Sequence, residues 1–190
     1  LLDDPTGGLD PVAASVIIFV TLQMQQDGDR ANMILLALTV ASALLTLARS
    51  SPLHMGYVPV LELGDDVCLT EVAAIVQYIA DRIPESGLAP RPFTLERYRL
   101  QEWLGFVGAE LHKAFVPLFK PDTPEDYKRS VREGLAARLG YVAAHLGGRD
   151  YLVGDRFTVA DGYLFTVLGW SRWVGIDIAR WPSLLAFQQR

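Results

Sequence analysis

Residues 151–165 have the sequence YLVGDRFTVADGYLF, and this stretch determines how the surrounding chain folds. Thr158 and Asp161 stand three positions apart immediately before an apolar run, which is the spacing of a capping box. In this motif the first side chain caps the helix N-terminus and the second binds back to the cap residue. Such a cap stabilises a helix by about 1 kcal/mol. We therefore expect a helix that starts at Thr158 and continues to about Trp173.

Long apolar lines at helical spacing lie on both sides of this helix. Upstream, residues 95–119 form one predicted helix, with an apolar line of Leu100, Leu104, Val107, Leu111, Phe115 and Leu118. A second helix begins near Pro124 and ends at Gly147 and Gly148, with an apolar line of Tyr127, Val131, Leu135, Leu139, Val142 and Leu146. Downstream, a last helix starts near Trp181, with Pro182 in its first turn. Residues 92–190 are thus expected to be entirely helical.

Strand patterns occur only before this helical region. Residues 58–63 and 67–69 are predicted as two short strands, and the turn residues 64–66 between them indicate a hairpin. A helix follows, ended by Pro84 and Gly87, and one apolar face is formed by Val72, Ile75, Val76 and Ile79. The expected fold class is therefore α+β and mainly helical.

The first 55 residues have a different character from the rest. They are apolar and poor in aromatic residues, and we expect helices over residues 12–25 and 32–47. Residues 32–48 carry no charge over 17 positions, which is about the minimum for a membrane span. A buried helix is the favoured explanation of this segment, and a membrane span is the alternative.

Composition excludes several classes of protein. The net charge is −5 over 190 residues, without a basic patch that would indicate nucleic-acid binding. The single cysteine, Cys68, excludes an intrachain disulfide and suits a cytoplasmic location. A buried, inert thiol is the favoured explanation of Cys68, and a nucleophile is the alternative. The cysteine and the histidines lack ligand spacing, so no metal site is predicted.

One face of the long helix carries small residues and a histidine. Gly105, Ala109, His112 and Val116 are expected to share that face. Close helix packing is the favoured explanation. A ligand groove with the polar pair His112-Lys113 at one end is the alternative.

Five segments in order then indicate a family. GYVPVLEL, LTEVAAIVQYIAD, LERYRLQEWLGF, ELHKAFVPLF and YLVGDRFTVADGYLF together resemble the beta class of bacterial glutathione transferases, over about 135 residues. The resemblance implies an all-helical C-terminal domain over residues 92–190, truncated at its last helix. It also implies that residues 56–85 are a partial thioredoxin-like domain, consisting of the hairpin and one helix.

The resemblance implies a glutathione site in the partial domain. Val58-Pro59 matches the cis-proline junction, whose backbone pairs with the cysteinyl part of glutathione, although the base rate of X-Pro bonds favours trans. Glu71 matches the residue that binds the γ-glutamyl amine. The backbone N–H of Val72, at a helix N-terminus, would bind the γ-glutamyl carboxylate. Val72 replaces the small residue usual in this class.

The resemblance also implies roles on the helical domain. His112 and Lys113 match the pair that lines the glutathione site, and we predict them as the catalytic residues. Gly105 replaces the asparagine of the class, so one polar contact to glutathione is missing. The pocket for the electrophilic substrate is expected at Phe115, Val116 and Trp170. The implied reaction is attack by the glutathione thiolate on a small electrophile, and the family is usually homodimeric.

Residues 1–55 depart from this family. No cysteine, serine or tyrosine stands in a first βα turn, so catalysis by this chain is left open, and a non-catalytic binding or interaction domain is the alternative function. Residues 1–17 instead resemble the Walker B and D-loop segment of an ABC-transporter ATPase. We interpret residues 1–55 as a foreign helical leader or, alternatively, a divergent native one.

Overall fold

The computed structural model describes residues 59–62 and 67–190. The chain divides into two compact units, Leu1–Ile79 and Ala80–Arg190. Helix α3 (Val72–Arg82) crosses the boundary between them. Several predictions lie outside the described residues: the helices over residues 12–25 and 32–47, the possible membrane span, the ATPase-like segment, Val58, and the turn at residues 64–66.

The first unit contains the predicted hairpin. Strands β1 (Val60–Glu62) and β2 (Cys68–Thr70) pair antiparallel, with Val60 opposite Thr70 and Glu62 opposite Cys68. Helix α3 follows directly, and Ile75 on its apolar face is buried. The hairpin and helix are therefore confirmed. Cys68 is half-buried, so the prediction of a buried thiol is wrong, because the described part of this sheet has only two strands and leaves the residue at a sheet edge.

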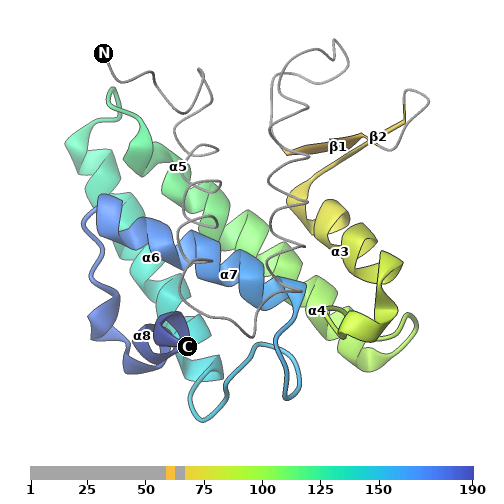
Figure 1. Cartoon of the computed structure of the whole chain (residues 1–190). Helices are drawn as coiled ribbons and strands as arrows, with labels where there is room; N and C mark the ends of the chain where they lie inside the picture. The colour runs from red at the N-terminus through yellow and green to blue at the C-terminus, as the bar shows by residue number, and fades with distance from the viewer. Residues whose placement is uncertain (1–58, 63–66) are drawn as a thin grey trace, which may run out of the picture. The chain divides into compact units, whose positions relative to one another are not determined.

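The long predicted helix is present but is not α-helical throughout. Helix α4 (Leu95–Phe106) continues through a π-helical segment, η3 (Val107–His112), into α5 (Lys113–Phe119). The backbone N–H of Lys113 donates to the carbonyl of Gly108, five residues earlier. The predicted apolar line is confirmed, because all six of its residues are buried. Figure 1 shows the three segments as one continuous rod.

Helix α6 (Glu125–His145) is confirmed within one residue of its predicted start. Its core-facing residues Leu135, Leu139 and Val142 are fully buried. Tyr127 is 56% exposed, which contradicts its predicted place on the buried face. The first turn of α6 carries Glu125 and Asp126 and is solvated, so the apolar line contacts the core only farther along the helix.

Helix α7 (Val159–Gly169) starts at the predicted capping box. Asp161 is fully buried and accepts three hydrogen bonds: from the backbone N–H of Thr158 at 2.8 Å, from its hydroxyl at 2.7 Å, and from the N–H of Leu152 at 2.8 Å. The helix continues as a 3₁₀ turn, η4 (Trp170–Trp173), which confirms the predicted end.

The helices of the second unit pack around α7. It lies against α4 and the π-helical segment, while α6 lies against α5 (Figure 1). After a 3₁₀ turn, η5 (Ile178–Arg180), helix α8 (Pro182–Gln189) packs on both α6 and α7. Trp181 caps α8 and Pro182 is its first residue, as predicted. The prediction of a mainly helical α+β fold is confirmed.

An ion pair between buried Arg97 and exposed Asp81 joins the start of α4 to the end of α3. A 3₁₀ turn, η2 (Pro84–Ser86), follows α3, and Arg97 on α4 is buried. The Arg97 guanidinium binds both carboxylate oxygens of Asp81 and donates to the carbonyl of Pro90 at 3.0 Å. The pair thus fixes the end of α3 against the start of α4, with the charge of a buried arginine compensated.

Candidate functional site

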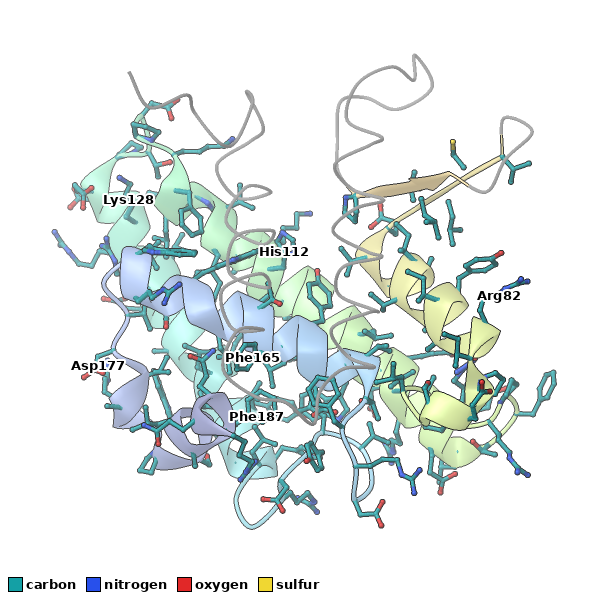
Figure 2. All side chains as sticks on the ribbon, in the orientation of Figure 1. Arg82, His112, Lys128, Phe165, Asp177 and Phe187 are labelled. Carbon is teal, nitrogen blue, oxygen red and sulfur yellow. The ribbon has the colours of Figure 1, made fainter. Side chains whose placement is uncertain are left out.

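His112 lies at the end of the π-helical segment, beside α7 (Figure 2). Its Nδ1 is 2.7 Å from the hydroxyl oxygen of Tyr163 on α7, which is a short hydrogen bond. On another side, the Trp170 indole meets the imidazole edge to face, with ring centroids 4.7 Å apart and planes at 84°. The imidazole is therefore held by two elements distant from it in sequence.

Burial determines the charge of this imidazole. The side chain of His112 is half-buried, and burial lowers its pKa below the ordinary value because it penalises the charged form. Since histidine ordinarily titrates near pH 6.5, a lowered pKa leaves His112 neutral at pH 7. A neutral imidazole has one N–H donor and one acceptor nitrogen. His112 can thus act at pH 7 as a single donor or as a base, but not as a fixed positive charge.

An aromatic cluster adjoins His112. Trp170 contacts Phe115 and Phe119, with ring centroids 5.9 Å apart in each case and nearly perpendicular planes. Phe115 and Trp170 are buried, whereas Val116 is half-buried. The Nε1 of Trp170 is a buried donor without an acceptor in the described part of the chain. Two of the predicted pocket residues are therefore in contact with each other, and Trp170 also contacts His112.

Lys113 and Gly105 are exposed. A Cβ added to Gly105 would meet no atom within 4 Å, so close packing, the favoured explanation of the small-residue face, is wrong at that position. Gly105 lies in α4, before the π-helical segment, which holds more residues per turn than an α-helix and changes the direction of the side chains beyond it. Gly105 and Ala109 face solvent, while His112 turns towards α7.

The other predicted residues belong to the first unit. Pro59 is half-buried and precedes β1. Glu71 is exposed and has a φ of 70°, in the left-handed region, which costs a non-glycine residue about 1–2 kcal/mol. Its carbonyl accepts from the N–H groups of Ala74 and Ile75, both at 3.0 Å, and so begins α3. The predicted site residues that contact one another in the structure, His112, Phe115 and Trp170, lie on the helical unit.

Tyr163 is the residue of this site that sequence reasoning missed. It lies within residues 151–165, two residues after the capping box, where the sequence pattern predicts only an apolar helix. Its partner is 51 positions away, so no local spacing indicates the contact. Within residues 59–62 and 67–190, no group of three or more histidine, cysteine or acidic side chains could hold a metal ion.

Comparisons with known proteins identify the family. A family model described as "Glutathione S-transferase, C-terminal domain" matches residues 106–190. Glutathione S-transferase GstA of Escherichia coli O157:H7 is 46% identical over 135 residues, which cover 71% of this chain and 67% of that protein. The chain belongs to the glutathione S-transferase family. The prediction of a glutathione S-transferase fold and function is thereby confirmed.

Solved glutathione S-transferase structures agree with this assignment. A ternary complex of BphK, a bacterial glutathione S-transferase, is 55% identical, has a TM-score of 0.69, and covers 71% of this chain and 68% of its own. A beta-class glutathione S-transferase from Sphingomonas chungbukensis is 36% identical, has the same TM-score, and covers 94% and 86%. The similarity of residues 1–17 to a transporter ATPase is not borne out by these comparisons.

The predicted alternative of a membrane span concerns residues 32–48, which include none of the predicted site residues. Of the helices in the part that the structure describes, none is both long and apolar enough to cross a bilayer. The uncharged segment at residues 32–48 lies outside that part.

Proposed function

We propose that this glutathione S-transferase binds reduced glutathione as its co-substrate and conjugates it to small electrophiles. The observation that carries the proposal is the 46% identity to a glutathione S-transferase over the region that contains Glu71, His112 and Lys113. The reaction joins the glutathione sulfur to an electrophilic carbon and expels a leaving group or saturates a double bond. The protein's task is to favour the thiolate over the thiol, because the thiolate is the nucleophile.

The first unit would bind the γ-glutamyl end of glutathione. The carboxylate of Glu71 is exposed and suits the γ-glutamyl amine by charge. Val72 is the first residue of α3, and an N–H at a helix start suits the γ-glutamyl carboxylate. The backbone of Val58, before Pro59, is proposed to pair with the cysteinyl part as an added strand would.

The helical unit would act on the thiol and the electrophile. His112 and Lys113 supply a neutral donor and an ammonium group from adjacent positions of the long helix. Phe115, Val116 and Trp170 are proposed to line the electrophile pocket, and the aromatic contact between Phe115 and Trp170 suits an apolar substrate. Gly105 has no side chain to make the polar contact with glutathione that asparagine makes in the beta class.

Finer assignments are part of the same proposal. The five ordered segments support membership of the beta class. We propose a homodimer, the usual state in this family, and a cytoplasmic location, which the single cysteine suits. The domain boundaries at residues 56–85 and 92–190, and the foreign or divergent origin of residues 1–55, also remain predictions.

A non-catalytic binding domain is the second candidate. Gly105 favours it, because no described side chain approaches the position where the class carries asparagine. Weak retention of glutathione without turnover would follow from a missing polar contact.

The decisive experiment uses the full chain with glutathione and 1-chloro-2,4-dinitrobenzene. We expect calorimetric binding of glutathione together with enzyme-dependent formation of the conjugate. Binding without turnover would support the second candidate. A chain that neither binds nor turns over, yet shows the circular dichroism of a folded helical protein, would overturn both.

Replacing Gly105 with asparagine should strengthen glutathione binding by about 2- to 10-fold, since one added hydrogen bond contributes about 0.5–1.5 kcal/mol. The new side chain has space, because a Cβ at Gly105 meets nothing within 4 Å. Gly105→Ala is the control: it also replaces the glycine, with a larger gain in helix propensity than asparagine gives, but adds no polar group. Equal affinities for the two variants would contradict the proposed contact.

A further inference from the structure

The hydrogen bond between His112 and Tyr163 joins the π-helical segment to α7, and the two helices pack closely at this point. The Nδ1 to Oη distance is 2.7 Å, and the two rings meet at 74° with centroids 5.8 Å apart. A Cβ added to Gly108 would lie 3.6 Å from the Tyr163 hydroxyl oxygen and 3.8 Å from Cε1. The tyrosine ring therefore lies directly over a glycine, one helical turn before His112.

Packing restricts how the imidazole can turn. Trp170 contacts the ring at 4.7 Å and 84°, and Trp170 is itself fixed by Phe115 and Phe119. A side chain confined by an indole and bound at Nδ1 has little freedom about its outer torsion. Its second nitrogen, Nε2, consequently keeps one direction.

Among the described residues, Tyr163 is the direct polar partner of the His112 imidazole, and nearby charged groups have other contacts. Glu110 and Lys113 flank it on its own helix, and Glu110 is paired with Arg138 of α6 at 2.8 Å. On η4, Arg172 stacks over the Trp173 ring at 4.6 Å. Among the groups on α7, the Tyr163 hydroxyl is the titratable one that contacts the imidazole.

We propose that Tyr163 is a positioning residue: its hydroxyl donates to Nδ1 of His112 and so keeps the imidazole proton on Nε2. His112 then presents a fixed N–H donor from Nε2. Resting on the proposed function, this donor stabilises the glutathione thiolate, which a bare Nε2 lone pair would repel. No proton is transferred in this role, because the imidazole stays neutral and donates a hydrogen bond only.

The test compares the full chain with Tyr163→Phe, which removes only the hydroxyl. Long-range nitrogen–proton spectra of ¹⁵N-histidine-labelled protein at pH 7 report the tautomer, and His112→Gln assigns the His112 signals. We expect the unaltered chain to show Nδ1 as the unprotonated nitrogen and Nε2 as the protonated one. Tyr163→Phe should shift the Nδ1 signal towards that of a nitrogen without a hydrogen bond. A proton on Nδ1 in the unaltered chain, or identical nitrogen shifts in both, would overturn the proposal.

Kinetics test the catalytic part. Tyr163→Phe should lower kcat/KM for glutathione by about 3- to 10-fold, the effect of one hydrogen bond, with an unchanged circular dichroism spectrum. Tyr141→Phe is the matched control, since Tyr141 is 58% exposed and contacts Trp103 and Phe106 instead. Equal losses in both variants, or none in Tyr163→Phe, would overturn the catalytic part. A chain that binds no glutathione would instead overturn the proposed function, while the nitrogen spectra would still decide the tautomer.

Discussion

Replacing Asp161 with alanine should lower the free energy of unfolding by about 3–5 kcal/mol, the largest loss we expect from one substitution. The carboxylate is fully buried and accepts from two backbone N–H groups, those of Leu152 and Thr158, and from the Thr158 hydroxyl. Without it these donors stay buried, and each costs about 1–3 kcal/mol. Urea denaturation followed by circular dichroism measures the change.

An acidic cap on the surface provides the control. Asp177 accepts from the N–H of Ala179 at 3.0 Å, but that hydrogen bond is exposed. Asp177→Ala should cost less than about 1 kcal/mol, because water replaces an exposed partner. Similar losses for the two variants would mean that the buried bonds of Asp161 contribute no more than an ordinary cap.

Replacing Glu71 with glutamine should weaken glutathione binding by about 10- to 100-fold. If the carboxylate binds the γ-glutamyl amine, the substitution removes a charge-assisted bond of about 1.5–3 kcal/mol. The side chain is exposed, so the free energy of unfolding should hardly change. Calorimetric titration with glutathione checks the affinity, and denaturation checks the stability.

A second variant distinguishes the effect of the Glu71 carboxylate on binding from the effect of its backbone conformation on stability. Glu71 has a φ of 70°, which glycine adopts freely. Glu71→Gly should weaken binding as much as glutamine does, yet raise the free energy of unfolding by about 0.5–1 kcal/mol through relief of strain. Glu85→Gln, an exposed acidic residue on η2, should change neither quantity. Unchanged affinity in Glu71→Gln would exclude the proposed role.

Local signals made much of the fold predictable. The capping box occupies four consecutive positions, from Thr158 to Asp161. The apolar line of each helix is visible in the spacing of its apolar residues. The hairpin also followed from neighbouring residues. Such features depend on contacts within a few positions, which a sequence displays directly.

The candidate site was predictable only in part. His112 and Trp170 were named from the family resemblance, but Tyr163 was not, since its contact with His112 depends on how α7 packs. The π-helical segment was not predicted because its apolar line fits an α-helix equally well. That segment changes which of the later residues face α7, His112 among them.

The carboxylate of Asp161 also has a consequence for how this protein can vary. One oxygen closes the loop at Leu152 and the other starts α7, so loop closure and helix initiation share a single side chain. Extra residues inserted between positions 152 and 158 would lengthen the ring that this carboxylate closes, and both functions would suffer together. Insertions among residues 147–151, ahead of the closure point, would leave the ring intact. In related sequences, insertions should therefore be more frequent before Leu152, on the side of α6, than between Leu152 and Thr158.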